Sequence, residues 1–312
     1  MIYLSLSNSC NYKCPCCPCS DHNIESSVTY EAVADKISKE AAGPRPPAVT
    51  LSGGEPTIHP DFLKIMKLLY ENRIPVTILT NSSRLADADF NQRLLKAYPA
   101  TKNISIITTL YNVDPMQHDA ETGVQGSFQN SVDAVHIWSG YGARVTVKHC
   151  ITGRNYGKLS EFYRFVNETF DQSIKFQLSG IDYIGMTKEW VLSSKLTCRE
   201  LRPYLDSLLE DINRMKAAGK DRRVVYIACM PLCAASLKYK NYFIRNKDMM
   251  PFGYLSKKKN VKTRGYDSVK DAPGCLTCLA YDECAGTYKS AFDVMGDELV
   301  IPFYSEEKTC LV

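Results

Sequence analysis

Five cysteines stand close together near the start of the chain, in the stretch CNYKCPCCPC at residues 10–19. Cys10, Cys14 and Cys17 have the spacing C-x3-C-x2-C, and a loop with such short spacings can wrap around one metal centre. Three thiolates leave one position of a cubane iron–sulfur cluster open, whereas four would close it. Cys16 and Cys19 form a C-x2-C pair, so a different register, a zinc site and a redox dithiol also fit this stretch.

A second group of cysteines lies near the other end of the sequence. Cys275, Cys278 and Cys284 have the spacing C-x2-C-x5-C, and Cys310 follows at a distance. Two close thiolates, a third after a short loop and a fourth from afar can close four ligands around one centre. An iron–sulfur cluster and a structural zinc would both satisfy this pattern, and spacing alone does not separate them.

Four further residues are candidates for catalysis or substrate contact. Cys229 and Cys233, in IACMPLCAA, fit a partial second metal site, a thiol that donates a hydrogen atom, or buried structural thiols, and burial is the usual state of a cysteine. Asp182 and Tyr183 stand at the expected end of the sixth strand, where substrate contact and turn packing are both reasonable roles.

The segments that must position these residues alternate short β-branched or apolar runs with amphipathic helical stretches. This alternation is typical of repeated βα units and predicts an α/β fold with a parallel sheet. We expect strands near residues 2–7, 47–51, 75–79, 103–108, 143–150 and 173–178. We expect helices between them, near residues 29–42, 60–73, 84–97, 128–139 and 158–170.

The rhythm of strands and helices changes after a helix expected near residues 199–218. Residues 221–312 contain short strands such as 223–227, a basic stretch and six of the 13 cysteines. We therefore predict one domain over residues 1–220 and a small α+β domain over residues 221–312.

A glycine pair follows the second strand, in Ser52-Gly53-Gly54-Glu55-Pro56. Glycines after a strand let the backbone approach a ligand closely, although a Gly-Gly turn often only ends a strand. At its distance behind the C-x3-C-x2-C loop, this motif resembles the GGEP motif of the radical S-adenosylmethionine (SAM) superfamily, and CNYKCPCC resembles the cysteine signature of the same family.

The resemblance implies a partial (β/α)6 barrel of the TIM type in which Cys10, Cys14 and Cys17 hold a [4Fe–4S] cluster. In that family SAM chelates the unique iron, and one-electron reduction cleaves SAM to methionine and a 5′-deoxyadenosyl radical that abstracts a substrate hydrogen. Cys16 departs from the family pattern, because the residue before the third cysteine is commonly aromatic. The residues that the resemblance assigns to SAM binding are Gly53, Gly54, Glu55, Pro56, Asn81, Thr108 and Thr109.

The C-terminal cysteines resemble the SPASM and shorter twitch extensions of radical SAM enzymes, which hold auxiliary [4Fe–4S] clusters. A full SPASM pattern has another cysteine where this chain has Tyr288, and that cysteine belongs to a further cluster. The resemblance therefore implies one auxiliary cluster in a twitch-like domain, with Cys275, Cys278, Cys284 and Cys310 as its ligands.

Enzymes with these extensions commonly modify peptides or proteins, so the resemblance implies a maturase that crosslinks, epimerises or oxidises a ribosomally made peptide. The alternatives are a radical SAM dehydrogenase, or a related enzyme, on a small carbohydrate or nucleoside-like substrate, and a non-catalytic metal or electron-transfer protein. The enzyme would need an electron donor such as flavodoxin or ferredoxin. No leader-binding domain is recognisable before the barrel, so a precursor peptide would bind the C-terminal domain or a separate partner.

Composition sets limits on localisation and partners. The chain has 312 residues, a net charge of +4, no signal-peptide pattern and no uncharged apolar run of membrane-spanning length, which predicts a cytoplasmic protein without a membrane anchor. The charge is too small to indicate nucleic-acid binding by itself. Ten Lys or Arg residues against two acids lie between Lys238 and Lys270, and this stretch fits either an acidic leader peptide or a solvated loop.

Overall fold

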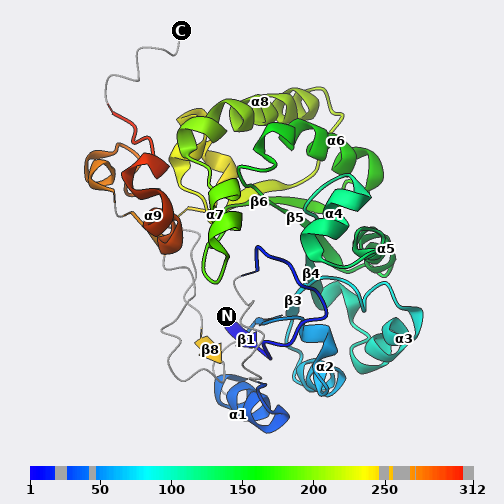
Figure 1. Ribbon diagram of the computed structural model, residues 1–312. Helices are drawn as coiled ribbons and strands as arrows, with labels where there is room; N and C mark the ends of the chain where they lie inside the picture. The colour runs from blue at the N-terminus through cyan, green and yellow to red at the C-terminus, as the bar shows by residue number, and fades with distance from the viewer. Residues whose placement is uncertain (18–26, 42–46, 246–252, 256–267, 271, 305–312) are drawn as a thin grey trace. The chain divides into compact units, whose positions relative to one another are not determined.

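The computed structural model describes residues 1–17, 27–41, 47–245, 253–255, 268–270 and 272–304 (Figure 1). It divides into two compact units. Unit 1 contains Met1–Lys148, Ser173–Lys175 and Met250–Thr263, and unit 2 contains the remaining residues.

Unit 1 is built on parallel strands that pair in chain order. The strands are β1 (Ile2–Ser5), β2 (Val49–Ser52), β3 (Val76–Thr80), β4 (Ile104–Thr109) and β5 (Arg144–Cys150), and β8 (Gly253–Leu255) pairs with the outer side of β1. The carboxyl ends of neighbouring parallel strands meet at one edge of a sheet. The loops that follow β1, β2 and β3 therefore start at the same edge.

The register of these strands is fixed by their buried apolar side chains. Leu4, Leu51 and Ile78 are register partners across β1, β2 and β3, and all three are at most 1% exposed. A slip of one residue would turn each of them to the opposite face. The helices of this unit are α1 (Tyr30–Ala41), α2 (Phe62–Glu71), α3 (Ala88–Ala97), α4 (Pro115–Thr122) and α5 (Ser127–Gly140) (Figure 1).

Unit 2 carries the later strands and the C-terminal cysteines. Strands β6 (Lys175–Ser179) and β7 (Val225–Ala228) pair in parallel, and helix α6 (Leu159–Thr169) contacts the long helix α8 (Cys198–Ala217). Its other elements are α7 (Lys188–Ser194), an antiparallel pair formed by β9 (Ser268–Val269) and β10 (Thr287–Tyr288), and α9 (Lys289–Met295).

The strand order confirms the predicted fold class. Strands β1 to β7 follow one another in sheet order as in chain order, and the order ends at β7 and β8 without closing. The fold is thus an α/β partial barrel. The predicted domain boundary near residue 220 falls within unit 2, between α8 and β7. The two compact units therefore divide the chain at other places than the predicted domains do. The domain boundary stays a prediction.

The expected strands and helices match observed elements within a few residues, but three short helices, α4, α7 and α9, were missed. Helix α4 has recognisable signals, because Asp114 caps its first turn, Pro115 is its first residue and Gly123 ends it with φ of 69°. Helix α7 is capped by Thr187. No helix in the described part of the chain is long and apolar enough to cross a membrane.

Helix α4 also contains a buried histidine. His118 is 0% exposed, and its Nδ1 accepts a hydrogen bond from the Tyr111 amide at 3.2 Å, which places the proton of the neutral ring on Nε2. Burial lowers the pKa of His118 to about 4, because the charged ring would lose its hydration.

We predict that His118 lowers stability in mild acid. In the unfolded chain the histidine has an ordinary pKa of about 6.5, so it takes up a proton between pH 6.5 and pH 4 that the folded ring does not take. The free energy of unfolding therefore decreases as the pH is lowered through this range, by about 3 kcal/mol at most. His118→Gln keeps an acceptor for the Tyr111 amide but does not titrate. Between pH 7 and pH 4.5 the unfolding temperature of the wild type should fall more than that of the variant, and equal falls would contradict the prediction.

Candidate functional site

The cysteines in the loop that follows β1 differ in their exposure to solvent. Cys10, Cys14 and Cys17 are each partly exposed, whereas Cys16 is 6% exposed and belongs to the core. The Cys17 amide donates to the Cys14 carbonyl at 3.1 Å, which forms a turn within the loop. The three predicted cluster ligands thus lie on the accessible part of the loop, and Cys16, at the usually aromatic position, packs inward. Cys19 lies outside the described residues.

The three sulfurs are close enough to influence one another's ionisation. Burial raises the pKa of Cys14 to about 12, and repulsion by the thiolates of Cys17 and Cys10 adds to that increase. The pKa of Cys10 is raised as well, chiefly by burial. A bound cationic cluster reverses this balance, because its charge stabilises deprotonated thiols. The residues present therefore fit a centre that binds three thiolates.

Hydrogen bonds already point at one of these sulfurs. The Tyr12 amide lies 3.4 Å from Cys10 Sγ, and Asn81 Nδ2 lies 3.7 Å from the same atom. Hydrogen bonds to ligand sulfurs are among the factors that tune iron–sulfur clusters. Asn81 Nδ2 also donates to Asn11 Oδ1 at 2.9 Å, so the predicted SAM-facing turn after β3 contacts the cysteine loop.

The glycine motif packs directly against the backbone that leads into Cys10. The Gly54 amide donates to the Ser7 carbonyl at 2.7 Å, and the Glu55 amide donates to the Ser9 carbonyl at 2.9 Å. A Cβ atom would lie 2.3 Å from Ser7 O at Gly53 and 2.1 Å from Ser9 O at Gly54, and both distances are too short for any side chain. The φ of Gly53 is also 125°, which favours glycine. Both glycines are therefore required for the contact between the two loops.

The Glu55 side chain lies beneath these loops and is 0% exposed. Its Oε1 accepts from the Thr57 amide and hydroxyl at 3.0 and 2.6 Å and from Thr80 Oγ1 at 2.7 Å, and its Oε2 accepts from the Asn81 amide at 2.6 Å. Burial raises the pKa of Glu55, although these hydrogen bonds oppose that increase. One carboxylate thus holds the glycine loop against the end of β3.

The remaining predicted SAM-binding residues differ in accessibility. Gly53, Gly54 and Asn81 are partly exposed, whereas Pro56 is buried at the start of a 3-10 turn (Pro56–Ile58). Because neighbouring residues of a strand point to opposite faces, Thr108 and Thr109 do not share a face. Thr108 is 0% exposed, and Thr109 is partly exposed.

The other side of the cysteine loop contacts the end of α4, and the sequence analysis did not predict this contact. The Lys13 amide donates to the Thr122 carbonyl at 2.9 Å, and Cys14 Sγ lies 3.9 Å from the same oxygen. A Cβ atom at Gly123 would lie 3.2 Å from Lys13 Cβ. The end of α4 therefore supports the loop, and the Gly123 stop signal was the feature that could have indicated it.

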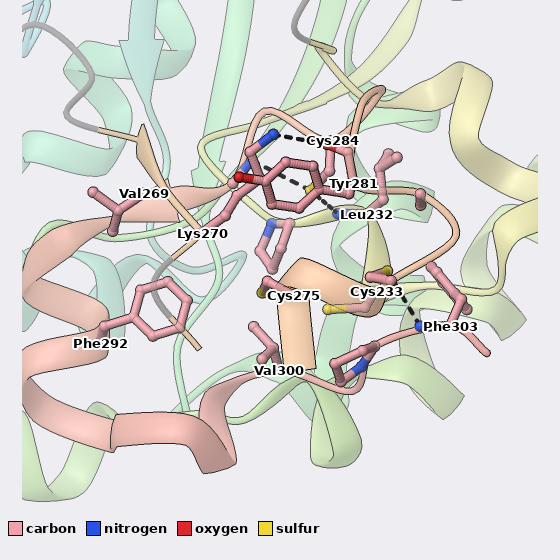
Figure 2. A pocket seen from close by; sticks show the side chains of 15 residues that line it. Leu232, Cys233, Val269, Lys270, Cys275, Tyr281, Cys284, Phe292, Val300 and Phe303 are labelled. Atoms are coloured by element: carbon pink, nitrogen blue, oxygen red, sulfur yellow. Dashed lines mark hydrogen bonds between the residues drawn. The ribbon is translucent and has the colours of Figure 1, made fainter. Parts of the chain in front are cut away.

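The C-terminal cysteines lie around one pocket of unit 2, which Figure 2 shows from close by. The pocket encloses about 380 Å³, part of it open to solvent, and Cys275, Cys278 and Cys284 line it together with Cys233. Burial raises the pKa of Cys275 to about 11, and the neighbouring thiolates add to that increase. The fourth predicted ligand, Cys310, lies outside the described residues.

The other candidate residues of unit 2 have partners within the protein. Asp182 Oδ1 accepts from Ser290 Oγ at 2.6 Å, and the buried Tyr183 donates from its hydroxyl to the Ser194 carbonyl at 3.2 Å. Cys229 has a φ of 58°, which is uncommon for a residue with a side chain, and the Tyr288 hydroxyl lies 3.2 Å from its sulfur. Their catalytic roles stay predictions.

At the start of the basic stretch, Lys238, Lys240 and Arg245 are paired with acidic side chains. Lys238 and Tyr239 contact Glu210 at 3.3 and 2.5 Å, and Lys240 and Arg245 contact Glu283 at 2.8 and 3.1 Å. An acidic leader peptide would have to compete with these contacts. Residues 246–252 and 256–267 of the stretch lie outside the described residues.

Among the residues that the structure describes, no group of three or more His, Cys, Asp or Glu side chains is placed to hold a metal ion.

The fold and the cysteine loop define the class to which the protein belongs. The family model described as the Radical SAM superfamily matches residues 4–166, just over half of the chain. The chain belongs to the radical SAM superfamily.

Two curated relatives match parts of the sequence. The probable GTP 3′,8-cyclase of Thermococcus kodakarensis is 28% identical over 171 residues, which are 53% of this chain and 52% of that protein. The Fe-coproporphyrin III synthase of Methanosarcina barkeri is 21% identical over 234 residues, which are 73% of this chain and 55% of that protein. The chain thus spans about half the length of the curated relatives it matches.

Solved structures share the fold. Streptococcus suis SuiB bound to S-adenosylmethionine superposes with a TM-score of 0.63 at 15% identity, and the match covers 100% of this chain and 77% of that chain. The protein anSMEcpe with bound AdoMet and a Cp18Cys peptide superposes with a TM-score of 0.56 at 18% identity, over 73% of this chain and 62% of that chain. At these identities the likeness concerns the fold.

We predict that Glu55→Gln loosens the glycine loop. The amide of glutamine can accept through only one oxygen, so buried donors that now bind the carboxylate lose their partner, at about 1–3 kcal/mol for each unsatisfied group. The free energy of unfolding should fall by at least about 2 kcal/mol. SAM affinity, measured by calorimetry on the reconstituted protein, should fall about 10-fold or more, as for other residues that position metal ligands.

The matched control is Glu71→Gln, which makes the same chemical change on the exposed face of α2, where Glu71 is 57% exposed and lies 3.7 Å from Lys67. This variant should retain the stability and SAM affinity of the wild type. Equal effects of the two substitutions would show that Glu55 does not position the loop.

Proposed function

We propose that the chain is an enzyme that cleaves SAM reductively and uses the resulting 5′-deoxyadenosyl radical to modify a ribosomally made peptide or protein. The observation that carries the SAM-dependent part is the hydrogen-bonded contact between the cysteine loop and the glycine loop. It brings three partly exposed cysteines beside the backbone of Gly53 and Gly54, which is itself partly exposed.

Accessibility suggests how the chain's residues share the work of binding SAM. A [4Fe–4S] cluster held by Cys10, Cys14 and Cys17 would leave one iron for SAM and supply the electron for its cleavage. Gly53, Gly54, Asn81 and Thr109 are the partly exposed candidates for contact with SAM. Glu55, Pro56 and Thr108 are buried, and we infer that they act by holding the loops in place.

A peptide substrate is supported by the solved structures that share the fold. SuiB has been solved with its precursor peptide SuiA, and anSMEcpe has been solved with a Cp18Cys peptide. The chain's task would be to place one C–H bond beside the reactive carbon of the adenosyl group and to exclude other hydrogen donors. Flavodoxin or ferredoxin would supply electrons, and a separate leader-binding protein would be a further partner.

The second candidate is a small nucleoside-like or carbohydrate substrate. It is favoured by the sequence match to a relative named as a probable GTP 3′,8-cyclase. Mass spectrometry separates the two candidates after incubation of the reconstituted enzyme with SAM, a reductant and either a short peptide encoded beside its gene or a panel of nucleotides and sugars. A mass change of the peptide supports the first candidate, and a modified nucleotide or sugar with an unchanged peptide would replace it with the second.

A twitch-like domain with an auxiliary [4Fe–4S] cluster completes the proposal. The cluster would be bound at the cysteine-lined pocket of unit 2, where the sulfurs of several cysteines face one space. Anaerobic reconstitution should then give about eight irons per chain, four for each cubane cluster. Zinc without acid-labile sulfide would contradict the proposal.

We predict opposite outcomes for two adjacent cysteines. Cys17→Ala should remove about four irons and abolish 5′-deoxyadenosine formation, because three thiolates hold the SAM-binding cluster. Cys16→Ala should keep the iron and the SAM cleavage and lower only the stability, because Cys16 is 6% exposed and packs in the core. Iron content and chromatographic detection of 5′-deoxyadenosine check both results, and SAM cleavage by Cys17→Ala would refute the ligand assignment.

A further inference from the structure

The pocket of unit 2 brings together four cysteines from two segments of the chain. Cys233 lies in a 3-10 turn (Leu232–Ala234), Cys275 lies in another (Pro273–Thr277), and Cys278 and Cys284 follow the second turn. Figure 2 shows the labelled side chains of Cys233, Cys275 and Cys284 around the same space. We propose that Cys233 is the fourth ligand of the auxiliary cluster, in place of Cys310, an inference that rests on the auxiliary-cluster part of the proposed function.

Backbone amides are aimed at the sulfurs that line this pocket. Cys284 Sγ accepts from the amides of Leu232 and Gly286 at 3.4 and 3.3 Å, and Cys278 Sγ accepts from the Phe303 amide at 3.3 Å. Amide donors stabilise ligand thiolates. Leu232 directly precedes Cys233, so a hydrogen bond already joins the turn that carries the proposed fourth ligand to the sulfur of Cys284, another proposed ligand.

The position of Cys233 is fixed by an arginine from α8. Arg202 Nε and Nη2 donate to the Cys233 carbonyl at 3.1 and 3.0 Å, and Nη2 also donates to the Ile301 carbonyl at 3.1 Å. The guanidinium lies 5.1 Å from the centre of the Phe303 ring. These contacts join the Cys233 turn to the chain segment whose amide reaches Cys278, and so preorganise two sides of the pocket.

The walls of the pocket suit a negatively charged thiolate cluster. Most of its non-cysteine lining is apolar, with Leu232, Val269, Phe292, Val300 and Phe303 among the wall residues. No aspartate or glutamate is among the lining residues, and Lys270 is the single Lys or Arg among them. Lys270 Nζ donates to the Tyr281 carbonyl at 2.7 Å, which fixes its positive charge at the wall.

A neighbouring cysteine provides a matched control. Cys198 Sγ lies 3.8 Å from Cys233 Sγ, and both residues are buried, at 3% and 6% exposure. Cys198 is the first residue of α8 and does not line the pocket. Removing either thiol disturbs the same region of the core, but only Cys233 faces the proposed cluster.

The test uses the full chain with Cys10, Cys14 and Cys17 changed to alanine, so that the SAM-binding cluster is absent. Iron, acid-labile sulfide and the EPR spectrum of the dithionite-reduced protein are measured for this background and for it with Cys233→Ser, Cys310→Ser or Cys198→Ser added. We expect about four irons in the background and in the Cys310→Ser and Cys198→Ser proteins. Cys233→Ser should lose at least about half of the iron or show a changed cluster spectrum, because it removes one thiolate in four.

Loss of iron in Cys310→Ser with a normal cluster in Cys233→Ser would overturn the inference, and so would equal losses in Cys198→Ser and Cys233→Ser. A background without iron, or with zinc alone, would instead show that the auxiliary cluster itself is absent. If Cys233→Ser fails to fold, thiol alkylation of the wild type decides the question. Cys233 should react faster after the iron is chelated and Cys310 at an unchanged rate, and the reverse pattern would overturn the inference.

Discussion

The buried carboxylate of Glu55 is the interaction on which the site of unit 1 depends. It accepts hydrogen bonds from Thr57, Thr80 and the Asn81 amide, and it is completely withdrawn from solvent. Charged groups are rarely buried unless partners satisfy them, so the segments that supply these donors must arrive together. The end of β3 and the loop after β2 are thereby held in one arrangement, and the amide of Glu55 itself holds the backbone before Cys10.

This constraint explains why the cysteine loop needs so little structure of its own. Its residues between Cys10 and Cys17 form neither a helix nor a strand, and the loop is supported from both sides. The glycine loop binds the backbone at Ser7 and Ser9, and the end of α4 binds the backbone at Lys13. A loop fixed at both sides loses little conformational freedom when a cluster binds, so the three proposed ligand thiolates would need little rearrangement to bind one.

The sequence was informative where the structure depends on local patterns. The strands could be predicted because each contains a short run of buried, mostly β-branched or apolar residues, and the motif residues could be predicted because their spacing along the chain is short. The sequence did not predict that Cys233 and Cys275 line the same pocket, because this depends on how two turns that are 42 residues apart in the chain pack together. The contact of Thr122 with the cysteine loop could not be predicted for the same reason. Nor could the burial of Arg223, which is 0% exposed and donates to the carbonyls of Val166 and Phe170.

The two cysteine sites differ in a way that matches the roles proposed for them. The first site draws its three thiolates from one loop, so the fourth position of a cubane remains open to a ligand that is not part of the chain. The pocket of unit 2 has four cysteines from two segments of the chain, apolar walls and amides directed at two of the sulfurs. A cluster held by four such ligands has no open position. Its role would then be electron transfer or structural support, and substrate chemistry would be confined to the site that can bind SAM.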